Sequence, residues 1–348
     1  MPILRTQRNR IILLTLLLLL LLTALFCAAV GAYKIHPFDI PHLLFSSDLS
    51  ATETQARAVL LDIRMPRVLL AILVGCGFGA AGSAMQALFR NPLADPGLIG
   101  VSSGAALGAS LCIVLGTALW PAALLFAGIY APMVAAFVGA LVVAMMVYKI
   151  AANRGRLALP LLLLAGIAIN AITGAAIGLL VYIANDDQLR TLTFWNLGSL
   201  AGAQWKLIAV TTPLVLISIA ALARHSAALN AMLLGESEAL HLGVPVLAIK
   251  RQLLIASALC VGILVASTGT IGFIGLVAPH CIRLACGPDQ RVVLPGAMLF
   301  GAILTLAADL VARTIAAPAE MPLGILTALL GGPFFLVLLW RRRGQLGL

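Results

Sequence analysis

The sequence predicts an all-α polytopic membrane protein with about ten transmembrane helices and with both termini in the cytoplasm. Its composition gives the first indication: of 348 residues, 62% are hydrophobic and 10% are charged, and the mean hydropathy is +1.11. Soluble domains carry about 25% charged residues. The second indication is a succession of apolar runs, each of about 17 to 28 residues, which is the length that crosses a bilayer. We therefore expect residues 1–348 to form a single transmembrane domain.

The first span is predicted at residues 11–30, an apolar run of about 20 residues that follows three arginines. A cleaved signal peptide has a shorter apolar region, of about 7 to 15 residues. Phe26 also precedes Cys27, where a lipoprotein cleavage site requires a small residue. We expect a retained helix that starts in the cytoplasm.

Polar residues at 33–62 predict a periplasmic loop with one short surface helix. Nine more spans follow, at roughly 65–88, 96–116, 122–148, 158–184, 205–223, 251–269, 272–286, 292–313 and 323–340. In this topology, 15 of the 22 lysines and arginines lie on the cytoplasmic side and 7 on the outer side. Cytoplasmic loops carry the excess of positive charge. The distribution therefore supports an even number of spans, and it accounts for the net charge of +10 without a nucleic-acid partner.

Residues 64–108 contain the most distinctive pattern of the chain. Two arginines flank a proline, a span rich in Gly and Ala follows, and the polar turn RNPLADP leads into the next span. There Gly100, Gly104 and Gly108 recur every four residues and so share one helix face. Because small residues let helix backbones approach in lipid, we expect a helix contact along this face. Simple lipid-facing packing is the alternative.

The run R-x-P-R, then G-x-x-x-x-x-x-Q and R-N-P-L-A-x-P-G-x-x-G-x-x-x-G-A, resembles the FecCD-type permeases. These are the membrane subunits of ATP-binding-cassette importers for iron-siderophores, haem and cobalamin. Motifs at residues 269–283, 320–324 and 331–335 extend the resemblance over most of the chain. It implies a multi-pass permease of the bacterial inner membrane that works as a homodimer with two ATPase subunits and a periplasmic substrate-binding protein. It also implies no cofactor on this chain, since ATP is used by the partner ATPase.

Arg64, Arg67 and Arg313 lie at the outer ends of the second and ninth spans, where the orientation rule disfavours them. Arginines near a helix end can simply extend to the interface. The resemblance implies instead a positively charged rim, on which these three residues pair with glutamates of the binding protein. Asp309 lies one turn before Arg313 within the ninth span, so we expect the two to pair.

Residues 186–201 are too polar to span the membrane and too apolar for a solvated linker. They predict an interfacial periplasmic helix with Trp195 at headgroup level. The resemblance implies a lid or docking edge over the outer mouth of the pathway. Both interpretations remain open.

The largest cytoplasmic loop, residues 224–250, contains a segment bounded by glycines that predicts a short amphipathic helix. Its glutamates stand near the N-terminus, where the helix dipole favours them. An ordinary surface turn is the alternative, but the resemblance implies the coupling helix that contacts the ATPase. That segment comprises Gly235, Glu236, Ser237, Glu238, Ala239, Leu240, His241, Leu242 and Gly243. The resemblance also implies that Asn91 and Leu93, in the polar turn, belong to the cytoplasmic gate.

The sequence contains no pattern typical of an enzyme or of a metal site. The Walker motif is absent, and none of the four lysines follows a glycine, so we expect the nucleotide chemistry on another polypeptide. His280 has no histidine or carboxylate three or four residues further on and makes a poor metal ligand. A polar role at a helix end with Arg283 fits it better. The six cysteines show no CxxC spacing and are expected to pack as small apolar residues.

The cargo is predicted from what the spans lack and from two motifs. Asp309 is the one acid clearly inside a span. This disfavours a bare metal ion, which needs new ligands, and an ion-driven carrier, which needs a titratable group near the midplane. Residues 193–200 and 324–335 most resemble the haem-transporting members, so haem is the expected cargo, ahead of a ferric siderophore and of cobalamin. An ion-coupled secondary transporter and an intramembrane enzyme are the alternatives from other classes.

Overall fold

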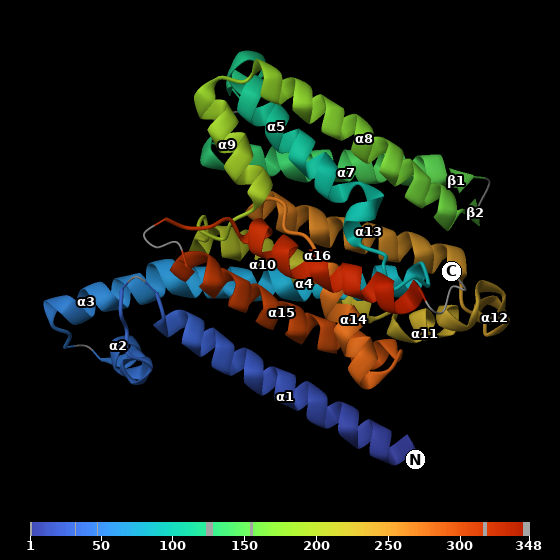
Figure 1. The fold of residues 1–348 in the computed structure, drawn as a ribbon, viewed down its shortest axis with the longest axis horizontal. Coiled ribbons are helices and arrows are strands. Elements are labelled where there is room, and N and C mark those ends of the chain that lie inside the picture. The colour runs from blue at the N-terminus through green and yellow to red at the C-terminus, as the bar shows by residue number, and fades with distance from the viewer. Residues whose placement is uncertain are drawn as a thin grey trace.

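The computed structural model describes residues 2–31, 33–46, 48–122, 128–153, 156–315 and 319–343. Nearly all of them are helical, and the long helices run roughly along the longest axis of the molecule (Figure 1). The expected all-α membrane fold is confirmed. α1 (Pro2–Ala29) begins and α16 (Leu323–Arg343) ends near the same end of the bundle (Figure 1). This arrangement agrees with two termini on one side of the membrane.

Between α1 and α16 the chain forms helices of very different length and one small hairpin. In order, the helices are α2 (Ile40–Phe45), α3 (Ala51–Ala58), α4 (Met65–Leu88), α5 (Val101–Leu119), α7 (Ala131–Ala151), α8 (Leu159–Ile183), α9 (Asp186–Leu197), α10 (Trp205–Ala223), α11 (Ser226–Leu234), α12 (Glu236–His241), α13 (Val246–Thr268), α14 (Ile274–Cys286) and α15 (Gln290–Ile315). Short 3-10 turns lie at Pro37–Asp39, Pro96–Ile99 and Gly128–Tyr130. Strands β1 (Ala152–Asn153) and β2 (Arg156–Leu157) pair antiparallel between α7 and α8.

Among the described residues, eight helices are long and apolar enough to cross a membrane, and two shorter apolar helices, Ile274–Cys286 and Leu323–Leu338, accompany them. Each expected span corresponds to one of these helices. A total of ten crossings stays a prediction, because the two shorter helices fall below the usual length of about 20 residues. Residues 123–127, expected near the start of the fourth span, lie outside the described residues.

The segment expected as a periplasmic loop is more helical than its composition indicates. α3 continues through a π-helical turn, Val59–Arg64, into α4, so that one unbroken helix covers Ala51–Leu88. Ser50 begins it with a capping box to Glu53, a helix-start signal that polar neighbours concealed. The part before α4 adds roughly 20 Å at about 1.5 Å per residue. α3 accordingly projects beyond its neighbours in Figure 1.

Two groups of helices share α13 between them. α5, α7 and α8 pack together on one side, and α1, α4, α14 and α15 form the other (Figure 1). A Cβ on Gly108 of α5 would lie 2.1 Å from the Ala135 carbonyl oxygen of α7. One on Gly104 would lie 2.5 Å from the carbonyl oxygen of Gly139, and one on Gly100 would meet a side chain of α7. The predicted helix contact along this glycine face is confirmed.

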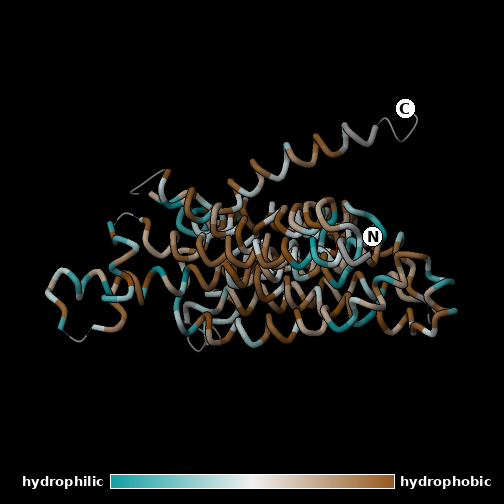
Figure 2. Tube along the Cα trace, turned by 90° about the horizontal axis from the view of Figure 1, so that it is seen from below, coloured by the Kyte–Doolittle hydropathy of each residue, from teal (hydrophilic) through white to brown (hydrophobic). Residues whose placement is uncertain are grey.

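α16 carries an apolar face that no described residue covers. Leu329, Leu336 and Trp340 are 64%, 66% and 75% exposed. Figure 2 shows the helix leaving the largely hydrophobic body toward its C-terminal end. α8 exposes Leu164 and Ile172 in a similar way. Surfaces of this kind contact lipid or another membrane helix.

Candidate functional site

A largely buried cluster of charges lies where α4 begins and α15 ends. Arg67 is 8% exposed, and its Nε donates to both carboxylate oxygens of Asp309, at 2.9 and 3.2 Å. Its Nη1 donates to both carboxylate oxygens of Glu320, at 2.8 and 2.9 Å. Arg313 lies on the other side of Asp309, with its Nε 3.6 Å from Oδ2. The expected pair of Asp309 and Arg313 is confirmed, and Arg67 is the nearer partner of the same carboxylate.

Arg64 and Arg313 hold the C-terminal end of α1. The Nη1 of Arg64 donates to the carbonyl oxygens of Ala28, at 2.9 Å, and of Ala29. The Nη2 of Arg313 donates to the carbonyl oxygen of Cys27. The last carbonyl groups of a helix lack intrahelical partners and carry partial negative charge. Two guanidinium groups therefore cap the first span.

These contacts bear on the expected docking rim. Arg64 is 4% exposed and Arg67 is 8% exposed, so both guanidinium groups face the protein interior. Docking of a partner on the three arginines stays a prediction. For docking to occur, acidic groups of the partner must displace the internal carboxylates and carbonyl oxygens that bind these arginines. The sequence alone could not show this network, because Arg67 and Asp309 are 242 positions apart.

α9 is the helix expected in residues 186–201, and its N-terminal end is fixed to α5. A capping box between Asn185 and Gln188 begins the helix. The Nε2 of Gln188 then donates to the carbonyl oxygen of Val114 in α5, at 3.1 Å. Leu192, one turn further on, is 1% exposed and packs in the same small apolar cluster as Val114. One face of α9 is thereby attached to the group formed by α5 and α8.

The C-terminal end of α9 meets α13 and α16. The backbone N–H of Ser199 donates to the carbonyl oxygen of Thr268 at 2.7 Å. Gly269 follows with φ 73°, and a Cβ there would lie 2.1 Å from the Trp195 carbonyl oxygen. A glycine is required at this position for both reasons. α9 therefore bridges the two groups of helices, as Figure 1 shows.

A cleft of about 430 Å³ opens between α9 and the end of α13. Its lining is Arg190, Thr191, Phe194, Trp195, Ser199, Ser267, Thr268 and Gly269. It combines a cation, two aromatic rings and hydroxyl groups at one place. Such a mixture is typical of a site for a small molecule that carries both polar and apolar parts.

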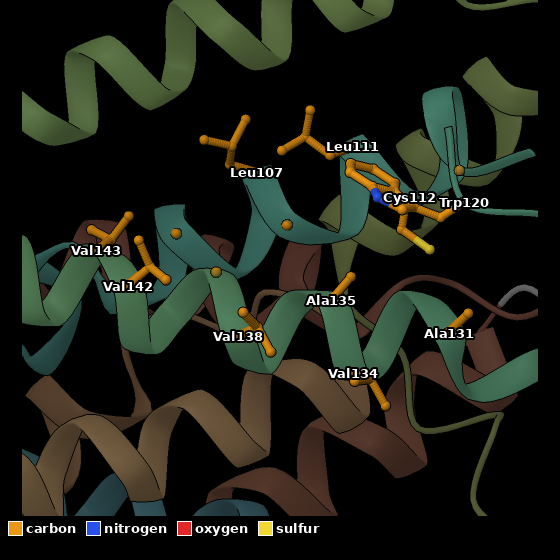
Figure 3. Close-up of a pocket in the computed structure, with 14 residues that line it drawn as sticks. Leu107, Leu111, Cys112, Trp120, Ala131, Val134, Ala135, Val138, Val142 and Val143 are labelled. Atoms are coloured by element: carbon orange, nitrogen blue, oxygen red, sulfur yellow. The ribbon is translucent and has the colours of Figure 1, made fainter. Parts of the chain in front are cut away.

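A second recess, of about 460 Å³, lies between α5 and α7 (Figure 3). Leu107 and Leu111 of α5 and Val138 and Val142 of α7 line it, with Trp120 near one end (Figure 3). The lining is almost wholly apolar. Such a recess suits a hydrocarbon chain and offers a polar cargo almost no hydrogen bonds. We therefore assign this recess no part in transport.

Asn91 and Leu93, expected in the cytoplasmic gate, lie in the turn between α4 and α5. The side-chain oxygen of Asn91 accepts the Leu93 N–H at 3.0 Å, which is an Asx turn. The backbone N–H of Asn91 donates to the Gln86 carbonyl oxygen at 3.1 Å. Asp95 follows, and its Oδ1 accepts the Gly97 N–H at 2.7 Å, although burial raises the pKa of this carboxyl group. Asn91 therefore shapes the turn that carries Leu93, and the gate itself stays a prediction.

The expected coupling segment contains α12, which follows a second helix, α11, that the sequence did not indicate. Lys250 of α13 is 4% exposed, and its Nζ lies 2.6 Å from the Oε2 of Glu236. This ion pair ties α12 to α13. Leu240 and Leu242 are 60% and 65% exposed. The segment therefore presents apolar side chains outward from a firmly held helix.

The backbone conformation and the close packing at the start of this segment explain the glycine at position 235. Gly235 has φ 148°, and a Cβ there would lie 1.8 Å from a carboxylate oxygen of Glu238. That carboxylate accepts its own backbone N–H and, at 2.8 Å, the hydroxyl of Ser237. These bonds lower the pKa of Glu238. Glu238 therefore keeps its charge at neutral pH.

Comparison with known proteins decides the family. A model of the FecCD transport family matches residues 16–341. The chain belongs to the FecCD transport family. The hemin transport system permease protein HmuU of Yersinia pestis is 49% identical over 286 residues, which cover 82% of this chain and 84% of the relative. The cobalamin import system permease protein BtuC of Halobacterium salinarum is 40% identical over 288 residues, which cover 82% and 74%.

A solved structure agrees with this assignment. A metal-chelate type ABC transporter in an inward-facing conformation superposes with a TM-score of 0.81 and 32% identity, over 95% of this chain and 99% of the other. This FecCD protein is therefore a permease of an ABC importer and a multi-pass protein of the bacterial inner membrane.

In this FecCD permease, α14 is joined to its neighbours by polar and aromatic contacts. The Nη2 of Arg283 donates to the Oε1 of Gln86 in α4 at 3.0 Å, and the Nε2 of Gln86 donates to the Leu276 carbonyl oxygen at 3.1 Å. The ring of His280 stands edge-on to Phe334, with centroids 5.9 Å apart. Within the described ranges, no group of three or more His, Cys, Asp and Glu side chains is arranged to hold a metal ion.

Two side chains of this permease were not singled out from the sequence. Lys250 counts there as one more cytoplasmic cation, and Arg190 as one of several outer cations. A lysine at the start of an apolar span is a signal for a buried or extended cation, but its partner follows only from the fold. Arg190 becomes informative only because α9 places it in a cleft with Phe194.

Proposed function

We propose that this FecCD permease is the membrane subunit of an ATP-driven importer that carries haem across the inner membrane. The observation that carries the proposal is the 49% identity with a hemin permease over 82% of the chain. Cobalamin is the second candidate, supported by 40% identity with a cobalamin permease. A ferric siderophore is the third, supported by the likeness to a metal-chelate type transporter.

The proposed assembly contains two copies of this chain, two ATPase subunits and a periplasmic substrate-binding protein. The exposed apolar faces of α8 and α16 offer a second copy a helix contact in the membrane. The exposed Leu240 and Leu242 beside α12 suit an apolar groove on an ATPase. In this proposal the chain holds no cofactor and is not itself an enzyme, because ATP is bound and hydrolysed by the ATPase.

Motion at α12 reaches the outer side through α13. At its cytoplasmic end α13 is held by the pair of Glu236 and Lys250, at 2.6 Å. At its outer end it is held to α9 by the bond between Ser199 and Thr268, at 2.7 Å. Lys250 is buried, and separating it from Glu236 would leave its charge without this partner inside the protein, which is costly. An ATPase that displaces α12 therefore moves α13 with it. α9 then moves at the outer mouth while the turn that carries Leu93 opens or closes the cytoplasmic mouth.

Arg64, Arg67 and Arg313 keep their proposed role as docking residues for acidic groups of the binding protein. The Glu320 side chain is 42% exposed, whereas that of Asp309 is 2% exposed. Glu320 is therefore the member of the charge cluster that a partner reaches first. A glutamate of the binding protein that replaces Glu320 beside Arg67 would keep the charge of Arg67 paired.

Uptake into proteoliposomes tests the cargo. The permease is reconstituted with its ATPase and binding protein, and ATP-driven uptake of haem, cobalamin and a ferric siderophore is measured side by side. We expect uptake of haem well above that of the other two. Uptake of cobalamin or of the siderophore without uptake of haem would support the assignment as an importer and contradict haem as its cargo.

A further inference from the structure

The cleft between α9 and α13 contains an arginine that the proposed mechanism does not use. Arg64 and Arg67 are buried and bonded within the protein. Arg190 is exposed, and its Cζ stands 5.9 Å from the centroid of the Phe194 ring. In the part of the chain that the structure describes, no hydrogen bond or ion pair engages its guanidinium group. Its donors are therefore available to a ligand.

The other groups of the cleft limit what that ligand can be. The hydroxyls of Thr191, Ser267 and Thr268 each donate to a carbonyl oxygen of their own helix, at 2.8, 2.7 and 2.9 Å. The hydroxyl of Ser199 accepts the Ala201 N–H at 3.1 Å and keeps its own hydrogen free. Among the described residues, the side-chain donors of the cleft that make no hydrogen bond within the protein are those of Arg190 and Ser199 and the indole N–H of Trp195. A set of donors that includes a guanidinium group favours an anionic acceptor.

The aromatic side chains add a second requirement. Phe194 is 52% exposed, and Trp195 is half-buried beside it. Exposed aromatic rings next to a cation suit a flat, apolar ligand that also carries negative charge. Asp186 and Asp187 stand in the first turn of α9 and do not line the cleft. The volume of about 430 Å³ lies within the range of small-molecule sites.

We propose that this cleft is an outer binding site for the carboxylate edge of an anionic aromatic chelate. Arg190 pairs with the carboxylate, Ser199 donates a hydrogen bond to it, and the rings of Phe194 and Trp195 contact the flat macrocycle. The proposal rests on haem as the cargo, since iron porphyrin combines a flat ring with propionate carboxylates. Cargo would then meet this site before it enters the pathway.

Binding of hemin to the permease–ATPase complex in nanodiscs tests the site without the binding protein. We expect Arg190→Gln to weaken hemin binding about tenfold or more, as the loss of a charge-assisted pair predicts, and Arg190→Lys to weaken it less. The matched control is Lys206→Gln, which removes an exposed outer cation at the start of α10 that does not line the cleft. The dimethyl ester of hemin, which lacks the carboxylates, should bind wild type and Arg190→Gln equally weakly.

The outcomes separate this site from the proposed function. If hemin binds Arg190→Gln as tightly as wild type, or if the ester binds wild type as tightly as the free acid, the site is overturned. Haem import by wild type with either of these results leaves the importer intact. An absence of hemin binding and of haem import by wild type overturns the cargo and the site together.

Discussion

Arg67 joins α4 to Asp309 in α15 and to Glu320 in the segment before α16. Because Asp309 is 2% exposed, its charge needs a partner inside the protein. Arg67 supplies a close one, at 2.9 Å, whereas Arg313 lies at 3.6 Å. This end of the bundle therefore depends on one guanidinium group that touches two acids.

Replacing Arg67 by methionine should destabilise the protein by about 3 kcal/mol, because a buried carboxylate loses its nearer partner. The matched control is Arg57→Met, since Arg57 is half-buried and makes one hydrogen bond of 3.4 Å to the Ser46 carbonyl oxygen. Thermal unfolding of the two purified variants measures the difference. Equal midpoints for the two variants would contradict the assigned role of Arg67.

We expect Asp95 to make the stability of this permease depend on pH. Burial raises its pKa above the ordinary value of 3.8, so the ionised form is disfavoured in the folded state and stability falls as pH rises through the raised pKa. Asp95→Asn keeps an oxygen for the Gly97 N–H and cannot ionise. We expect the variant to unfold like wild type below pH 3.8 and to be the more stable protein near about pH 7. A difference that does not change with pH would contradict this.

At the scale of the elements, glycines decide how closely helices approach. α5 and α7 touch backbone to backbone at Gly104 and Gly108, and α4 and α15 do so at Gly75 and Gly301. Without a hydrophobic force between helices in lipid, such contacts supply much of the packing energy. The glycine spacing in α5 predicted that this helix makes a close helix contact. It did not predict that α7 is the partner.

Gly108→Ala places a Cβ 2.1 Å from the Ala135 carbonyl oxygen, so α5 must move away from α7. We expect a loss of about 1–3 kcal/mol, the usual cost of overpacking, seen in thermal unfolding and in the yield of folded protein. Gly178→Ala is the matched control, since a Cβ there meets open space and alanine favours a helix by about 1 kcal/mol. The prediction fails if both variants behave alike.

The link between α12 and α13 rests on the ion pair of Lys250 with Glu236, at 2.6 Å. Lys250→Met removes the pair, and ATP-driven uptake should fall at least about tenfold relative to ATP hydrolysis, a loss of about 1.4 kcal/mol of coupling. Arg251→Met is the control, because Arg251 is the exposed neighbour of Lys250. Uptake per ATP that stays unchanged in Lys250→Met would remove α13 from the transmission path.

The sequence and the structure agree most where hydropathy decides the element. The apolar spans, α9 and the short helix α12 were predictable, because length and polarity alone mark them. One short surface helix was expected in residues 33–62, but its start at Ala51 and its continuation into α4 were missed because the capping box stands among polar residues. α11 was missed because its apolar residues continue the preceding span. The charge cluster around Arg67 could not be predicted, since it joins residues 242 and 253 positions apart.

At the scale of the whole molecule, the parts to which we assign a role in transport lie at its two ends. In the proposed topology, the outer end holds the charge cluster, α9 and the cleft with Arg190, and the cytoplasmic end holds α12 and the turn with Leu93. α13 runs between them, buried along most of its length. The chain carries no Walker motif in its sequence, so we assign the energy source to a separate ATPase.

The ATP dependence of uptake distinguishes an ABC importer from an ion-coupled carrier. The permease is reconstituted with its binding protein, with or without the ATPase, and haem uptake is measured with ATP, without ATP and with ionophores that dissipate proton and sodium gradients. We expect uptake that requires both ATP and the ATPase and is unaffected by the ionophores. Uptake that proceeds without the ATPase and stops when the gradients are dissipated would contradict an ATP-driven importer and would assign the chain to ion-coupled carriers.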